Sequence, residues 1–364
     1  MATNWLTKFA ETASGTDRFT GKADHAALLA AGLMGEAGSV LTELKKEERE
    51  RDAYPGYRRR MLEEIGDFLW YYVRLVTVVD VALLAELSLP SRIEARRSAA
   101  HTLPLFLELG AAVGKVLAVV SKGDGPTGYQ EELRPLLRHV WDTLGRVSQE
   151  SQVDLQSAAE HNAQKIESRW PRRRAYVSLF DDAFPEEEQL PRQLDIEFRE
   201  RSRGERKVVI LRCNGVNFGD RVTDNIQDPD GYRYHDIFHF AHAVHLGWSP
   251  VVRALLHCKR KSSPRIDEAE DGARAGILEE AVAAVVFSRA KQLNFFDGID
   301  HLDYDLLKIV REFVQGYEVA EVPLWQWEAA ILDGYRSFRK LRSNRGGRVI
   351  LDLQRRELSY IAPS

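Results

Sequence analysis

The chain has 364 residues, 44% hydrophobic and 29% charged, a composition typical of a soluble globular protein with two domains. Its formal net charge of −4 argues against nucleic acid or an anionic membrane as a partner. The two cysteines form no C-x-x-C pair, and the N-terminus lacks the pattern of a secretory signal peptide. We therefore expect a cytoplasmic protein without a disulfide framework or a cysteine zinc site.

Residues 24–168 are predicted to be helical almost throughout, because apolar residues recur every three or four positions. The expected helices cover residues 24–50, 57–87, 91–121, 129–149 and 152–168. Segments 52–57 and 122–128, each with proline and glycine, are the clearest breaks. The long apolar segment 68–87 carries Arg74 and Asp80, which a membrane span tolerates poorly, so we expect buried helices there.

The two halves of this helical region are similar to each other. Residues 107–123 match the pattern of residues 32–46, and residues 131–147 match that of residues 64–77. Such a duplicated helical hairpin would give a four-helix core. We therefore predict an all-α domain over residues 1–171.

Acidic residues lie at helical spacing in two of these segments. Glu36 and Glu43 are seven residues apart, which places both on one face, and Glu64 and Asp67 are three apart. Two antiparallel helices can bring four such carboxylates together, and hard oxygen ligands at that density suit Mg²⁺ or Mn²⁺. Metal ions held in this way commonly act on phosphates. The alternative is that the acids lie on solvated helix faces.

A third segment, "EHNAQKIESRW" (160–170), completes a recognisable pattern with "GEAGS" (35–39) and "EEIGDFLWYY" (63–72). Together, residues 20–171 resemble the MazG-like all-α nucleoside triphosphate pyrophosphohydrolases. The resemblance implies a helical bundle that hydrolyses the α–β phosphoanhydride with Mg²⁺, releasing a nucleoside monophosphate and pyrophosphate. It also implies a homo-oligomer whose substrate is a nucleoside triphosphate or a related nucleotide.

Individual residues match positions of this family. By resemblance, Glu36, Glu64 and Asp67 are metal-ligating and catalytic residues, and Asn162 and Lys165 lie near the substrate. Two more site residues come from position alone. Glu43 lies on the right helix face to be a fourth metal ligand. Lys46 follows the first acidic helix, where it either binds a phosphate or is the solvated end of the helix.

Ser39 is the departure from the pattern, because the family usually has a second glutamate at this position. This difference keeps a second hypothesis open. The first domain would then bind a nucleotide with weak turnover, as a sensor. The second half of the chain would be its effector or a second metal-dependent hydrolase.

A charged, proline-rich linker is predicted over residues 172–193, followed by an α+β domain over residues 194–364. Alternating residues in 194–220 predict a hairpin with a turn near 203–205 and a short third strand. Residues 346–361 are predicted to form a closing hairpin that pairs with the strands near residue 200. The expected helices cover residues 232–247, 249–258, 267–293, 302–315 and 323–342. This half is similar to a C-terminal extension carried by some MazG-like proteins.

Histidines are concentrated in "YHDIFHFAHAVH" (234–245). His235, His239 and His242 share one helix face, Asp236 flanks them, and imidazoles at i and i+4 can bind one metal ion. The acids most suited to complete such a site are Glu279 and Glu280. We therefore consider a second metal site, beside the alternative of a structural network of histidines and carboxylates.

Overall fold

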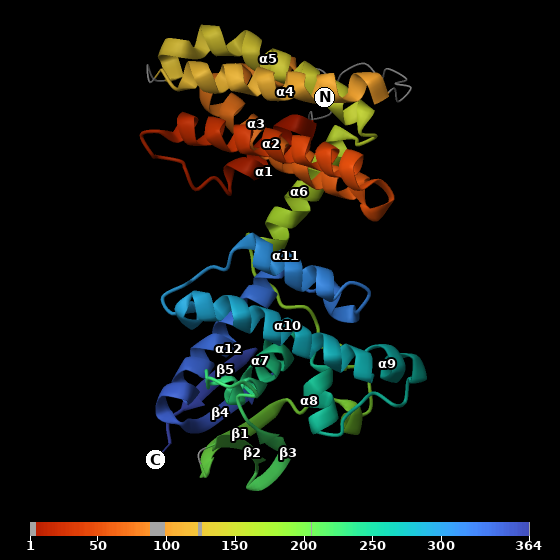
Figure 1. The fold of residues 1–364 in the computed structure, drawn as a ribbon, viewed down its shortest axis with the longest axis vertical. Helices are drawn as coiled ribbons and strands as arrows, with labels where there is room; N and C mark the ends of the chain where they lie inside the picture. The colour runs from red at the N-terminus through yellow and green to blue at the C-terminus, as the bar shows by residue number, and fades with distance from the viewer. Residues whose placement is uncertain (1–4, 88–98, 123–125, 205, 364) are drawn as a thin grey trace. The chain divides into compact units, whose positions relative to one another are not determined.

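The structure, a computed structural model, describes residues 5–87, 99–122, 126–204 and 206–363. The chain divides into two units, Met1–Trp170 and Pro171–Ser364. The first is all-α, and the second combines helices with a small antiparallel sheet, so the predicted fold class is confirmed (Figure 1). Residues 172–193, which we expected to be a linker, belong to the second unit.

The first unit is built from helices that match the predicted ones closely, with an additional helix before them. They are α1 (Trp5–Ser14), α2 (His25–Glu50), η1 (Arg51–Ala53), α3 (Tyr57–Glu86), α4 (Ala99–Val120), α5 (Pro126–Glu150) and α6 (Leu155–Arg169). We did not predict α1. Helix α5 begins earlier than expected, and the predicted start of α4 lies outside the described residues.

Two helical hairpins form the core of the first unit. Helices α2 and α3 form one and α4 and α5 the other; α2 packs on α4, and α3 on α5 (Figure 1). The buried stripe of α2 has the helical spacing that such packing requires. It consists of Leu29, Leu33, Ala37 and Val40. Helix α6 packs on α3, so the last helix of the unit lies against one of the acid-bearing helices.

Among the described residues, three helical segments are long and apolar enough to cross a membrane by length and composition alone. They are His25–Ala53, Tyr57–Glu86 and Thr102–Val120. In the most apolar part of these segments, 39%, 61% and 39% of the residues, respectively, are buried within the protein. Arg74 on α3 is buried and donates two hydrogen bonds to Asp17 Oδ2, at 2.9 and 2.8 Å. Packing inside the unit therefore accounts for much of the apolar composition of α3.

The sheet of the second unit has the order β3-β2-β1-β4-β5, and all neighbouring strands are antiparallel. Its strands are β1 (Gln193–Arg203), β2 (Arg206–Cys213), β3 (Val216–Val222), β4 (Gly346–Asp352) and β5 (Glu357–Ile361). The closing hairpin pairs with β1, as predicted. Gly346 has a φ of +127°, and a Cβ there would lie 2.4 Å from the carbonyl oxygen of Phe198, so this pairing requires glycine.

Helix α7 is buried at every residue and packs against α8, α10 and α12. The described helices of the second unit are η2 (Glu186–Glu188), η3 (Tyr232–Tyr234), α7 (Asp236–Leu246), α8 (Pro250–Leu255), α9 (Pro264–Ala269), α10 (Ala273–Gln292), η4 (Asn294–Phe296), α11 (Tyr304–Phe313), η5 (Glu318–Glu321) and α12 (Leu324–Asn344). The single helix predicted over 267–293 is wrong at its start. Asp271 accepts hydrogen bonds from the backbone and side chain of Arg260, which holds the chain out of a helix between α9 and α10.

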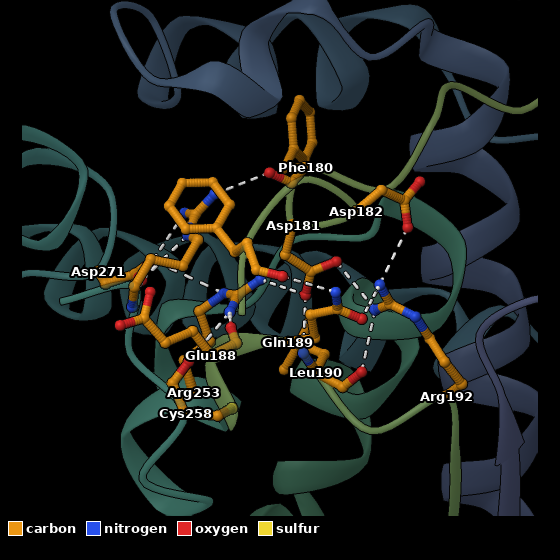
Figure 2. Close-up of polar contacts among 12 residues, drawn as sticks. Phe180, Asp181, Asp182, Glu188, Gln189, Leu190, Arg192, Arg253, Cys258 and Asp271 are labelled. Atoms are coloured by element: carbon orange, nitrogen blue, oxygen red, sulfur yellow. Dashed lines mark hydrogen bonds and ion pairs between the residues drawn. The ribbon is translucent and has the colours of Figure 1, made fainter. Parts of the chain in front are cut away.

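The segment before β1 is fixed to the second unit through Asp181, which is fully buried (Figure 2). Its Oδ2 accepts hydrogen bonds from the backbone N–H of Leu190 and from Arg253 Nη2, both at 2.7 Å. Its Oδ1 accepts a hydrogen bond of 2.9 Å from Arg192 Nη1. Arg253 also donates to the carbonyl oxygens of Glu188 and Cys258, so the segment follows a defined path.

Candidate functional site

Three carboxylates meet where α2 faces α3. Glu36 on α2 and Glu64 and Asp67 on α3 each offer an oxygen, and these oxygens lie within 4.8 Å of one another. The helices position them because the adjacent apolar residues, Ala37 on α2 and Ile65 and Phe68 on α3, are fully buried in the core. The acids therefore lie at the margin of the core, partly buried.

This cluster fits a hard divalent cation. Burial, and then the charges of Asp67 and Glu64, raise the pKa of Glu36 to about 7, although Lys165 lowers it. A raised carboxyl pKa means that the negative charges repel one another in a partly desolvated place. Three carboxylate oxygens with this separation are the ligand type that Mg²⁺ and Mn²⁺ prefer. A cation bound among them would relieve the repulsion.

Helix α6 brings two more of the predicted residues to the cluster. Asn162 Nδ2 donates a hydrogen bond of 2.5 Å to Asp67 Oδ1, and Lys165 forms an ion pair with the same oxygen. Gly66 allows this close approach, because a Cβ there would lie 2.7 Å from the carbonyl oxygen of Ala158 on α6. The Oδ1 atom of Asn162 is buried and has no hydrogen-bond partner among the residues that the structure describes.

Two predicted residues are not brought to the cluster. Glu43 is buried, and its carboxylate accepts hydrogen bonds from Tyr54 and Lys46, the latter at 2.6 Å. Glu43 and Lys46 therefore pair with each other, and Glu43 lies about two turns of α2 after Glu36. We expected Glu43 to be a ligand because it shares a helix face with Glu36, but Tyr54, eleven residues further along the chain, accounts for its burial.

Tyr71 is a residue of this region that the sequence patterns did not single out. A Cβ on Gly32 would lie 2.1 Å from the Tyr71 ring, so the ring packs directly on α2 at this glycine. Burial, and then the charges of Glu36 and Asp67, raise the pKa of the Tyr71 hydroxyl. The aromatic run "LWYY" that follows the acids was the available signal, but it did not show which ring lies near the carboxylates.

The second unit brings all six residues of the predicted histidine cluster together. His239 Nδ1 lies 3.0 Å from Glu279 Oε1, and His239 Nε2 lies 3.3 Å from Glu280 Oε1. His242 Nδ1 is hydrogen-bonded to Glu279 Oε1 at 3.0 Å. The contacts of the other two residues, His235 and Asp236, converge on the same place. Two overlapping groups, His235–His239–Glu280 and His239–His242–Glu279, have ligand atoms close enough to share a metal ion.

Comparison with protein families matches residues 175–364 to the MazG C-terminal domain. Comparisons with curated proteins and with solved structures gave no match. The family match covers the second unit and its histidine cluster, in agreement with the expected C-terminal extension, and does not extend to the three carboxylates of the first unit. Since it spans more than half of the chain, the protein belongs to the MazG-like family.

Proposed function

We propose that the first unit is a Mg²⁺-dependent nucleoside triphosphate pyrophosphohydrolase. In this reaction water adds to a phosphorus atom of the α–β anhydride, the bond to the bridging oxygen breaks, and a nucleoside monophosphate and pyrophosphate leave. The observation that carries the proposal is the convergence of Glu36, Glu64 and Asp67 within 4.8 Å. Membership of the MazG-like family supports the same class of reaction.

Each residue of the cluster has a role in this proposal. Glu36, Glu64 and Asp67 would hold Mg²⁺, with Mn²⁺ as a substitute. The bound cation would neutralise phosphate oxygens and activate water. Asn162 and Lys165 orient the Asp67 carboxylate, and the Lys165 ammonium adds a positive charge at the edge of the cluster, where a phosphate oxygen can approach. We propose cytoplasmic location and a homo-oligomer on the basis of sequence.

The test is an assay of pyrophosphate and phosphate release from a panel of nucleoside triphosphates with Mg²⁺. Glu64→Gln removes one ligand charge with little change of shape, and we expect a loss of about 100-fold or more in pyrophosphate release. Glu63→Gln is the matched control, because Glu63 neighbours Glu64 on α3 but is not one of the three clustered acids. Full activity of Glu64→Gln, or no cleavage of any nucleotide, would overturn the proposal.

Ser39 motivates a second candidate function, a nucleotide sensor with weak turnover. This residue is half-buried on α2, one turn after Glu36. By the resemblance described above, the family usually has a glutamate at this position. If the site has lost a ligand, Ser39→Glu should raise Mg²⁺-dependent pyrophosphate release. If Ser39 belongs to a working site, the same change should lower it, and the sensor hypothesis would then be rejected.

A further inference from the structure

The histidine cluster of the second unit contains a buried carboxylate, Glu279, and a partly exposed one, Glu280. This difference indicates which residues of the cluster bind a metal ion. We propose that His235 Nε2, His239 Nε2 and Glu280 bind one divalent transition-metal ion, with Asp236 beside them and Glu279 as an outer partner of His239. This site is independent of the carboxylates in the first unit.

His235 presents one particular nitrogen to the site. Its Nδ1 lies 3.0 Å from the backbone carbonyl oxygen of Tyr232, which can only accept, so Nδ1 carries the hydrogen. In the neutral ring Nε2 then has a free lone pair. This atom lies 3.7 Å from Glu280 Oε2 and 3.8 Å from Asp236 Oδ1. The ring also stacks on Tyr232, with centroids 4.4 Å apart, which fixes its orientation.

His239 has two buried ring nitrogens that both face carboxylates, and within the described part of the chain neither makes a hydrogen bond of acceptable geometry. The side chain is fully buried, so water does not compensate for these missing bonds. If Nδ1 carries the hydrogen and faces Glu279, then Nε2 points its lone pair at Glu280 Oε1, 3.3 Å away. A cation between Nε2 and Glu280 would resolve this repulsion, and a carboxylate behind the other nitrogen is the usual partner of a metal-bound histidine.

Glu279 is better suited to an outer role than to metal ligation. Its two oxygens accept hydrogen bonds from His242 Nδ1, Ser249 Oγ and the backbone N–H of Val251, at 2.9–3.0 Å. These donors occupy the carboxylate, which is fully buried. Glu280, in contrast, has a side chain 44% exposed, and its contacts within the cluster are to the two histidines. An ion bound by Glu280 would therefore remain accessible to water on one side, as catalytic metal sites require.

The distances fit a first-row transition metal. Ligands bound at about 2.1 Å in a tetrahedral or octahedral arrangement are about 3.0–3.4 Å apart. The two nitrogen–oxygen pairs of the proposed ligand set are 3.7 and 3.3 Å apart, and all three ligand atoms lie within 4.8 Å of one another, so side-chain movements of about an ångström reach that spacing. Two imidazoles with a carboxylate favour Zn²⁺, Fe²⁺, Co²⁺ or Ni²⁺ over Mg²⁺, which prefers oxygen ligands alone.

The competing interpretation is a metal-free network in which His239 is an imidazolium ion between two carboxylates. Although burial alone would lower it, the charges of Glu279 and Glu280 raise the pKa of His239 to about 10. A protonated ring would satisfy both carboxylates without a metal. The two interpretations differ in what occupies the space between His239 Nε2 and Glu280, and metal binding therefore separates them.

The experiment uses the full chain, stripped of metal with a chelator and then titrated with Zn²⁺ or Co²⁺. We expect one ion per chain at this site, the absorption spectrum of nitrogen-bound Co²⁺, and imidazole scattering in X-ray absorption of the Zn²⁺ form. The binding must persist in Glu64→Gln, because this variant affects only the carboxylate cluster of the first unit. Loss of the ion in Glu64→Gln would assign it to the first unit and overturn the proposal.

Glu280→Gln tests the ligand set without disturbing the core, because Glu280 is partly exposed. We expect this change to weaken Zn²⁺ binding by at least about 10–100-fold. His301→Gln is the matched control, because His301 Nδ1 lies 3.1 Å from Glu328 Oε1, an imidazole–carboxylate pair outside the cluster. The proposal fails if no ion binds in stoichiometric amount, if both variants bind equally well, or if NMR shows His239 doubly protonated after Zn²⁺ addition.

Discussion

Asp181→Asn is expected to be one of the most destabilising single substitutions in the second unit. The carboxylate has three donors, Arg253, Arg192 and the backbone N–H of Leu190, whereas an amide offers only one acceptor oxygen (Figure 2). The substitution keeps the shape of the side chain but leaves the Arg253 guanidinium, 1% exposed, without its closest carboxylate.

The magnitude follows from the burial of this pair. Breaking a fully buried ion pair by removing one partner costs about 3–5 kcal/mol. For a unit of this size, that loss corresponds to a decrease in Tm of about 6–20 °C. Arg253 retains two carbonyl acceptors and lies 3.7 Å from Asp271, so we expect about 4 kcal/mol rather than the upper limit of the range.

Differential scanning calorimetry of the full chain measures the effect. Asp182→Asn is the matched control: Asp182 also accepts a hydrogen bond from Arg192, at 2.9 Å, but is 57% exposed, so its loss should cost less than about 1 kcal/mol. Replacing Arg253 by methionine in the Asp181→Asn chain should recover stability, because it removes the uncompensated charge. The reasoning is refuted if Asp181→Asn costs under about 1 kcal/mol, or if Asp182→Asn costs as much.

Further predictions concern the first unit and the sheet. Asp17→Asn should cost about 3 kcal/mol at neutral pH, since it breaks the buried pair with Arg74. Burial raises the pKa of Asp17, but hydrogen bonds from His25 and Arg74 lower it below its ordinary value. The stabilising contribution of Asp17 is therefore complete above about pH 4 and is lost as the pH falls further. Denaturation of both chains at two pH values measures this change. Gly66→Ala should displace α6 and reduce pyrophosphate release with α2–α3 still folded, as helix-resolved hydrogen exchange would show. Gly346→Ala should unpair β4 from β1 and lower the Tm of the second unit.

Helical spacing predicted the three clustered carboxylates well, because residues three apart share a face wherever the helix packs. The same rule suggested Glu43, and there it was insufficient, because Tyr54 from the following turn determines the surroundings of that carboxylate. Composition suggested a linker at 172–193, yet Asp181 within it is fully buried, through partners that lie up to 72 residues away. A local sequence pattern carries no information on contacts between segments that are distant in the chain.

The histidine cluster illustrates the same limit within one site. The spacing of His235 and His239 identifies their shared helix face, and two adjacent acids on α10 were reasonable partners. Nothing in the sequence distinguishes Glu279 from Glu280. The distinction arises because Ser249 and Val251, at the start of α8, donate hydrogen bonds to Glu279 and not to its neighbour.

The order of the site residues along the chain has a consequence for synthesis. Glu36, Glu64 and Asp67 are made first, and Lys165 contacts Asp67 across 98 positions of sequence. A growing chain can therefore form the α2–α3 hairpin, a local structure, well before α6 exists. At that stage the three acids lie close together without the ammonium group of Lys165 and the amide of Asn162, which α6 supplies. Docking of α6 on α3 therefore completes both the fold of the first unit and the set of polar contacts around Asp67.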